Sequence, residues 1–161
     1  MSTRRAHLTS LGLAAATPLA VAAPVALASA APAAAATRVA GPMELVARRT
    51  KITLPDLPKL GVSYIALLDL FDSAGTKLGQ ASTSSFVVDV AVEGPIVLGT
   101  IVLQLADGEI HYQRLIRRYG DYPRTATGAI TGGTGEYAGA TGEVDVSCPD
   151  ADTVQLAVKL G

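Results

Sequence analysis

The sequence has few of the residues that build disulfide, metal and aromatic sites. Its 161 residues include one cysteine, two histidines, no tryptophan and 4% aromatic residues overall. With Cys148 alone, no intrachain disulfide can form. His111 is the only histidine beyond residue 36, so the sequence offers no zinc site of the usual spacing, and we expect no metal.

Acidic residues are absent from the first 36 residues, which are rich in alanine. Arg4 and Arg5 precede an apolar run over residues 8–28, and small residues follow it. A basic start, an apolar stretch and a small-residue cleavage site are the parts of a secretory signal peptide. We therefore predict a signal peptide over residues 1–36 and one folded domain over residues 37–161, secreted to the extracellular space or held in the cell envelope.

The residues around the two arginines leave the export route open. The segment Thr3-Arg4-Arg5-Ala6-His7-Leu8 resembles a twin-arginine signal, although that pattern usually has phenylalanine where His7 stands. The general secretory route is the alternative. An uncleaved membrane anchor is disfavoured because prolines interrupt an alanine-dominated segment of low hydrophobicity. We expect no stable membrane anchor after cleavage.

The charge of the expected domain argues against a nucleic-acid partner. Removing Arg4 and Arg5 from the 13 basic residues leaves 11 against 14 acidic ones, a formal net charge of −3. A mildly acidic domain without tryptophan or a basic stripe is a poor nucleic-acid binder. We interpret the short basic clusters at residues 48–51 and 117–118 as solvated strand edges, where charge discourages aggregation.

Beyond residue 42 the apolar segments are short, rich in valine, isoleucine and leucine, and separated by turn residues, which is typical of antiparallel sheets. Asp107-Gly108 is the clearest hairpin turn. Eight or nine such strands predict a sandwich or a closed barrel, and closure would leave no strand edge exposed. The expected strands are Met43–Leu54, Val62–Phe71, Lys77–Thr83, Phe86–Glu93, Ile96–Leu105, Glu109–Arg118, Thr125–Thr131, Gly142–Ser147 and Thr153–Leu160.

The glycine-rich segment from Ala129 to Val144 does not have the pattern of a phosphate-binding loop. It lacks the Gly-Lys-Ser/Thr ending of a P-loop, and no helix pattern starts at its last glycine, as a dinucleotide site requires. We expect Gly132, Gly133 and Gly135 to adopt turn conformations, or to allow close backbone approach, that a side chain would prevent.

The same segment resembles the motif that allene oxide cyclases and dirigent-like β-barrel proteins carry late in their chains. The similarity is close from Ala129 to the C-terminus and looser over residues 60–118, where it is mainly one of strand spacing. The resemblance implies an all-β fold, a closed antiparallel β-barrel of about eight strands. It also implies a lumen that binds a small molecule without a cofactor.

The resemblance does not extend to the chemistry of the plant cyclases. Where those enzymes carry an aspartate, a proline and a polar pair that positions a water, this chain has Val62, Ile65, Leu67 and Leu68. Glu44 is the nearest match to the family's glutamate on the first strand. We therefore do not expect cyclisation of a fatty-acid epoxide, and we assign no catalytic residue.

The strand predicted over residues 109–118 carries the best candidates for ligand contacts. His111, Tyr112 and Arg114 crowd together there, with Glu44 a weaker candidate on the first strand. Because side chains alternate across a strand, His111 and Tyr112 should face opposite sides. We favour Tyr112 and Arg114 inside, where an arginine can anchor a ligand carboxylate or enolate, and His111 outside or at a subunit contact.

Two functions are compatible with this reasoning. The domain either binds an apolar small molecule and directs its cyclisation or coupling, or acts as a non-catalytic carrier, envelope component or oligomeric interaction module. The expected partners are an apolar small molecule and, as one option, further copies of the chain. Polar groups converging on an open pocket would favour the first function, and a lumen filled by leucine and valine the second.

Overall fold

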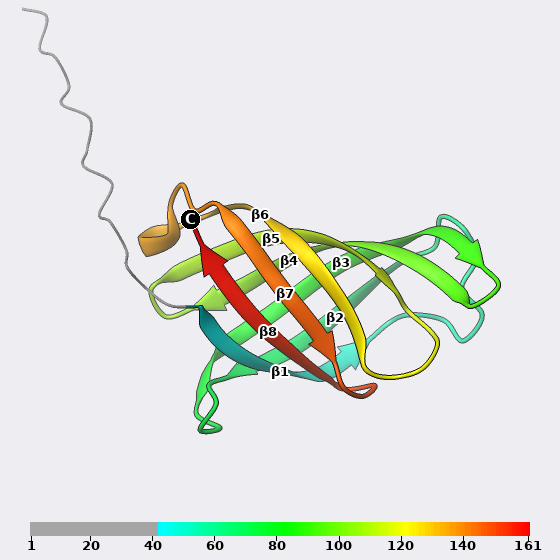
Figure 1. The fold of residues 1–161 in the computed structure, drawn as a ribbon, viewed down its shortest axis with the longest axis horizontal. Coiled ribbons are helices and arrows are strands. Elements are labelled where there is room, and N and C mark those ends of the chain that lie inside the picture. The colour runs from blue at the N-terminus through cyan, green and yellow to red at the C-terminus, as the bar shows by residue number, and fades with distance from the viewer. Residues whose placement is uncertain (1–41) are drawn as a thin grey trace, which may run out of the picture. The chain divides into compact units, whose positions relative to one another are not determined.

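Residues 42–161 are described by the computed structural model, and the predicted signal peptide of residues 1–36 lies outside them. The described chain forms one closed barrel in which each strand is antiparallel to the next and β8 pairs with β1 (Figure 1). This confirms the predicted all-β barrel of eight strands. The elements are β1 (Met43–Ile52), β2 (Ser63–Phe71), β3 (Lys77–Ala91), β4 (Gly94–Leu105), β5 (Gly108–Arg117), β6 (Arg124–Gly133), the 3-10 helix η1 (Gly135–Tyr137), β7 (Gly142–Cys148) and β8 (Thr153–Leu160).

Strand β3 is continuous where the sequence predicted two strands. Ser84 pairs with Ile65 of β2 and with Thr100 of β4, so the ladder runs through the expected break. The neighbouring Ser85 faces the lumen and is buried. The prediction of a break was wrong because a serine is small enough to continue the inward face of a strand. The only irregularity nearby is a register shift after Val87.

Because side chains alternate between the two faces of each strand, apolar side chains fill much of the lumen. Leu70, Leu103, Ile110 and Val144 have no exposed surface and belong to one large hydrophobic cluster. Burial of this kind supplies the main favourable free energy of folding. A second, smaller cluster of Tyr64, Val87 and Val97 lies apart from the first, and polar residues occupy the space described below.

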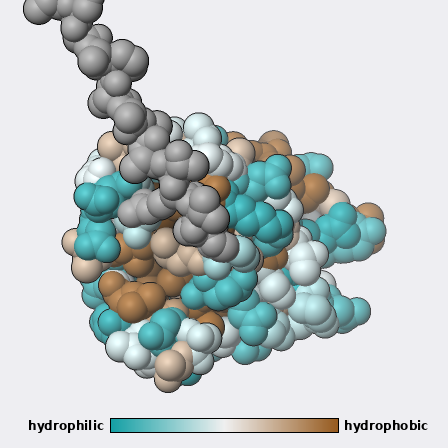
Figure 2. Space-filling view, turned by 60° about the vertical axis from the view of Figure 1, so that its left-hand side comes forward, coloured by the Kyte–Doolittle hydropathy of each residue, from teal (hydrophilic) through white to brown (hydrophobic). Residues whose placement is uncertain are grey.

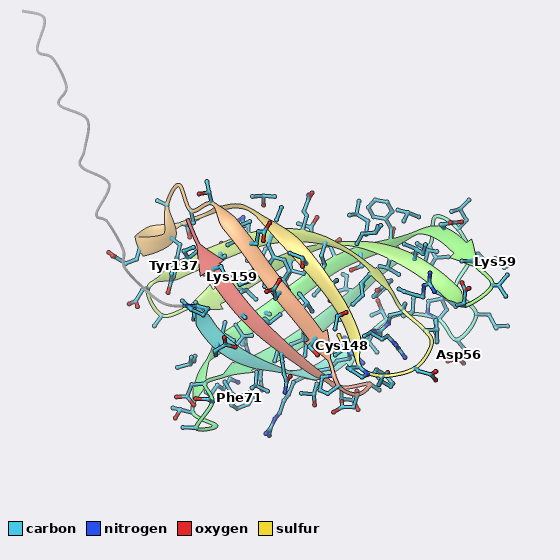
Figure 3. The ribbon with its side chains drawn as sticks, viewed as in Figure 1. Asp56, Lys59, Phe71, Tyr137, Cys148 and Lys159 are labelled. Atoms are coloured by element: carbon cyan, nitrogen blue, oxygen red, sulfur yellow. The ribbon has the colours of Figure 1, made fainter. Side chains whose placement is uncertain are left out.

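The connection between β6 and β7 closes one end of the barrel. Tyr137 of η1 is buried in the large hydrophobic cluster, while Cys148 lies toward the opposite end (Figure 3). Gly135 has a φ of +59°, and a Cβ there would lie 2.3 Å from the carbonyl oxygen of Asp107. Only a glycine fits so close a contact between this connection and the β4–β5 turn.

The other two glycines of the motif are constrained differently from each other. Gly132 has a φ of +147°, beside a register shift in which Thr131 is the extra residue of β6. Gly133 has no positive φ, but a Cβ there would lie 2.5 Å from the carbonyl oxygens of Glu109 and Tyr137. At Gly133, a side chain is therefore excluded by the close approach of the backbone and not by a turn conformation.

The β4–β5 hairpin turns one residue earlier than predicted. Ala106 and Asp107 form its two-residue loop, and Gly108 begins β5 with a φ of +143°. Figure 2 shows hydrophobic side chains reaching the surface in separate groups among hydrophilic ones. Within residues 42–161, no helix is long and apolar enough to cross a membrane.

Candidate ligand-binding site

A hollow lies inside the barrel toward the end opposite η1. Its volume is about 40 Å³, which suffices for a few water molecules. A larger ligand needs the side chains at the mouth to move. The lining residues are Arg49, Ile52, Tyr64, Ala66, Leu68, Thr83, Ser85, Val97, Gly99, Arg114, Ile116, Arg117, Arg118, Arg124, Cys148 and Val154.

Arg114 projects into this hollow between two glycines. It pairs in register with Gly99 of β4 on one side and with Gly128 of β6 on the other. A Cβ on Gly128 would lie 2.7 Å from Cδ2 of Tyr112 and 3.2 Å from Cβ of Arg114. The absence of side chains at both neighbouring positions makes room in the wall for the Tyr112 ring and the long arginine.

The guanidinium of Arg114 has hydrogen-bond donors that the protein does not use. Its Nε and Nη1 atoms are buried, and no group among residues 42–161 accepts a hydrogen bond from them. Tyr112 lies beside Arg114 with 2% of its surface exposed. Burial raises the pKa of the Tyr112 hydroxyl above its ordinary value, and the adjacent Arg114 charge opposes this shift. Tyr112 is therefore a neutral hydroxyl at physiological pH.

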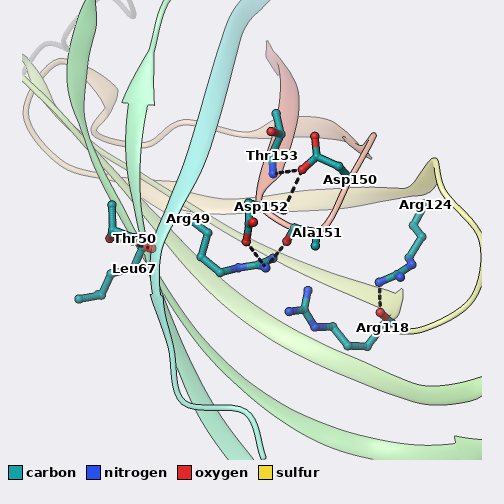
Figure 4. A network of polar contacts seen from close by, with 9 residues as sticks. All are labelled: Arg49, Thr50, Leu67, Arg118, Arg124, Asp150, Ala151, Asp152 and Thr153. Atoms are coloured by element: carbon teal, nitrogen blue, oxygen red, sulfur yellow. Dashed lines mark hydrogen bonds and ion pairs between the residues drawn. The ribbon is translucent and has the colours of Figure 1, made fainter. Parts of the chain in front are cut away.

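Arg49 reaches the same hollow from β1. Its side chain is 11% exposed, and its Nη1 donates to the carbonyl oxygen of Ala151 and pairs with Oδ1 of Asp152 at 3.4 Å (Figure 4). Burial lowers the pKa of Arg49, and the charge of Arg118 lowers it further. The Nε atom of Arg49 is buried and finds no acceptor in the described chain. The charge and the hydrogen-bond donors of the Arg49 guanidinium are thus only partly satisfied by the described chain.

Two more arginines lie at the mouth, Arg118 in the loop between β5 and β6 and Arg124 at the start of β6. Arg124 donates from Nη1 to the carbonyl oxygen of Arg118 (Figure 4). It also donates from Nη2 to the carbonyl oxygen of Gly120 at 3.0 Å. Its guanidinium also lies 3.9 Å from the ring centre of Tyr122. Figure 4 shows the side chain of Arg118 directed toward that of Arg49. Backbone oxygens hold Arg124 in place, whereas the Arg118 side chain donates no hydrogen bond to any group among residues 42–161.

The charges of the lining are all of one sign. Five arginines and no aspartate or glutamate line the hollow. Arg117 pairs with Glu93 at 3.4 Å and Arg49 with Asp152, but both carboxylates are well exposed. Guanidinium groups in a water-poor concave site attract carboxylates and related anions strongly. The geometry therefore suits an anionic group.

This corrects the interpretation of the basic clusters as solvated strand edges. Arg48 and Lys51 are exposed, whereas Arg49 and Arg118 lie at the hollow. The alternation of the strand explains the difference, because Arg49 follows the inward-facing Ala47 at a spacing of two residues. That spacing is visible in the sequence and was the signal that sequence reasoning missed.

The structure separates the four residues predicted as ligand contacts. Tyr112 and Arg114 face inward, as the alternation of β5 predicts, but Tyr112 lies in the core behind Arg114 and does not line the hollow. His111 faces outward and pairs with Glu109 at 3.0 Å. Glu44 is exposed on the outer wall because its neighbour Leu45 points inward. Neither His111 nor Glu44 reaches the hollow.

Three lining residues with hydroxyl groups, Tyr64, Thr83 and Ser85, were not among the predicted contacts. Tyr64 and Ser85 are buried and lie in register with one another on β2 and β3. A Cβ on Gly99 would lie 2.9 Å from Oγ of Ser85, so this hydroxyl sits close to the strand pair that carries Arg114. Within residues 42–161, no group of three metal-ligating side chains is present.

The fold is similar to those of two solved enzymes, although no family model and no curated protein sequence matches the chain. Pyocyanin demethylase superposes with a TM-score of 0.61 and 29% identity, covering 74% of this chain and 99% of that enzyme. The exo-specific intermolecular Diels–Alderase AbnU has a TM-score of 0.53 and 18% identity, covering 74% and 93%. Neither is named as an allene oxide cyclase or dirigent protein, so that resemblance stays a prediction. The chain shares its barrel fold with solved enzymes that handle small molecules.

Proposed function

We propose that the domain binds a small molecule with an apolar body and an acidic group in the arginine-lined hollow, and directs its cyclisation, coupling or rearrangement without a cofactor. The observation that carries this proposal is the lining of five arginines and no carboxylate, with two unused buried donors on Arg114. A buried donor without a partner costs about 1–3 kcal/mol. A bound carboxylate or enolate would recover that free energy.

The apolar part of the ligand has a surface to contact. Ile52, Ala66, Leu68, Val97 and Val154 line the hollow together with the arginines. An acidic group held by Arg114 would place the rest of the molecule against these side chains. Most ligand sites combine such an apolar lining with a few polar anchors.

Catalysis in such a site would depend on position and charge. Holding reacting atoms together can lower a barrier by several kcal/mol without any cofactor, of the order of 7–11 in the best cases. The arginines would stabilise negative charge that develops on an enolate or carboxylate oxygen. The names of the two similar enzymes, a demethylase and a Diels–Alderase, support small-molecule chemistry in a barrel of this kind.

A second candidate is a non-catalytic carrier or interaction module. The small volume of the hollow, about 40 Å³, and the apolar cluster that fills the other end of the lumen favour it. Such a protein would hold its ligand at the mouth without changing it. We also propose that the domain works outside the cytoplasm, which follows from the signal peptide predicted for residues 1–36.

The experiment is a fluorescence titration of the purified domain with two probes of similar shape. Anilinonaphthalene sulfonate is an aromatic anion, and N-phenylnaphthylamine is its neutral counterpart. We expect saturable binding of the anion, at least about 10-fold tighter than the neutral probe, since a charge-assisted hydrogen bond contributes about 1.5–3 kcal/mol.

Two variants of the hollow are compared with one control variant, at the neighbouring Arg48. Arg49→Met and Arg114→Met should weaken binding of the anionic probe. Arg48→Met removes the same charge from the outer face and should not. Equal binding of both probes, or equal loss in all three variants, would contradict the proposed function.

A further inference from the structure

The hollow holds its arginines in two places, and we infer that its ligand carries two acidic groups. One would be bound by Arg114 inside the barrel, and the other between Arg49 and Arg118 at the mouth. This inference rests on the proposed function, because it specifies the class of ligand that the same hollow takes.

The inner place is built around Arg114. Its Nε and Nη1 are buried and unused, so the guanidinium can donate two hydrogen bonds to one carboxylate. Gly99 and Gly128 flank it in register, and the Ser85 hydroxyl and the Tyr112 ring lie where side chains at these two positions would be. Ser85 and Tyr64 line the same part of the hollow with hydroxyl groups. These features form a cradle for one acidic group.

The outer place lies between strand β1 and the β5–β6 loop. The side chains of Arg49 and Arg118 point toward one another across the mouth (Figure 4). The Nε atom of Arg49 is buried and unused, and no carboxylate of the described chain pairs with Arg118. Two like charges that face each other repel, and their repulsion contributes to the lowered pKa of Arg49. An anion between them would remove this repulsion.

The partner of Arg49 does not supply that anion. Asp152 contacts only Nη1 and is 78% exposed, so much of its charge is screened by solvent. It approaches Arg49 from the β7–β8 turn rather than from the side of Arg118 (Figure 4). The positive charge at the outer place is therefore not balanced by Asp152.

The two places are separated along the chain. Arg114 and Arg118 lie four residues apart, roughly 13 Å between their Cα atoms if the chain is extended. The Arg118 side chain turns toward Arg49 (Figure 4). The apolar side chains Ile52 and Val154 line the space with these arginines. Once the side chains at the mouth move aside, this arrangement suits a molecule with an apolar middle and an acid at each end.

The test compares straight-chain dicarboxylates with monocarboxylates of the same number of carbon atoms, by calorimetric titration of the purified domain. At the length that spans the two places, we expect the diacid to bind at least about 10-fold tighter than the monoacid, because it makes a second charge-assisted contact. Benzyl phosphate serves as a third arm, since it puts two charges on one group. It should bind no tighter than the best diacid.

Variants separate the two places. Arg118→Gln should abolish the advantage of the diacid over the monoacid. Arg114→Met should weaken both ligands, and Arg48→Met, which removes an exposed charge from the outer wall, should weaken neither. Circular dichroism would verify that each variant is folded.

The outcomes distinguish this inference from the proposed function. If monoacids bind and no diacid binds better, or if the advantage of the diacid survives Arg118→Gln, the second acidic group is refuted while the proposed function stands. Tighter binding of benzyl phosphate than of any diacid would also refute it, in favour of one doubly charged group. If none of these anions binds, the proposed function itself is refuted.

Discussion

Replacing Arg114 by methionine should stabilise the domain while it weakens anion binding. The Nε and Nη1 atoms of Arg114 are buried without protein acceptors, and each unused donor costs about 1–3 kcal/mol. The hollow opens to solvent at its mouth, so we take the lower value, which gives a gain of about 2 kcal/mol for the two donors. Methionine keeps most of the apolar stem and adapts to irregular space.

The substitution also removes the interaction of the Arg114 guanidinium with the Tyr112 hydroxyl. An interaction of this kind contributes about 1 kcal/mol, so the expected net gain in the free energy of unfolding is about 1 kcal/mol. For a domain of this size, that gain raises the melting temperature by roughly 4 °C. In a Tyr112→Phe background the contact is already absent, and the gain from Arg114→Met should rise to about 2 kcal/mol.

Urea unfolding followed by circular dichroism measures both effects. An unchanged slope of the free energy of unfolding against urea concentration would show that the unfolding reaction is the same. Arg48→Met is the control. Its side chain lies on the outer wall, 5.1 Å from the ring centre of Phe71, and its loss should cost less than about 1 kcal/mol. A loss of stability of 1 kcal/mol or more for Arg114→Met would show that the protein itself satisfies this guanidinium and would refute the reasoning.

Three further predictions follow from other parts of the chain. Gly133→Val should lower the free energy of unfolding by about 1–3 kcal/mol in a urea titration, because its Cβ would meet two carbonyl oxygens at 2.5 Å, and an unchanged midpoint would contradict the close approach. Burial raises the pKa of Tyr112, so stability present below about pH 10 should decline as the pH rises above that value, and Tyr112→Phe should flatten this decline; equal alkaline profiles would count against the burial of the hydroxyl. N-terminal sequencing of exported protein should find a start near residue 37, and recovery of intact Met1 outside the cell would contradict the signal peptide.

The barrel itself could be predicted because short alternating strands and glycine-marked turns are local signals. The prediction of a break between residues 83 and 86 was wrong because serine is common in turns, whereas Ser85 faces the lumen in β3. The resulting eight strands close without an edge. Local patterns thus predict the number and kind of strands better than they predict where a strand continues.

The candidate site could be predicted only in part. Alternation along β5 correctly separates Arg114 from His111, because both residues lie within one regular strand. Arg49 and Arg118 were missed because each sits beside an exposed arginine, and a pair of adjacent basic residues resembles a solvated edge. Their approach to one another depends on barrel closure, which joins β1 to β8 and brings the β5–β6 loop to the same end. No local pattern encodes that contact.

The most direct test of the central claim is nuclear magnetic resonance of the arginine Nε–H groups during titration with anilinonaphthalene sulfonate. The signals of Arg49 and Arg114, whose Nε atoms are buried and unused, should shift and saturate together, while the signal of the exposed Arg48 stays in place. Saturable shifts confined to Arg48 and other outer-wall residues, with Arg49 and Arg114 unmoved, would contradict a binding site for anions inside the barrel.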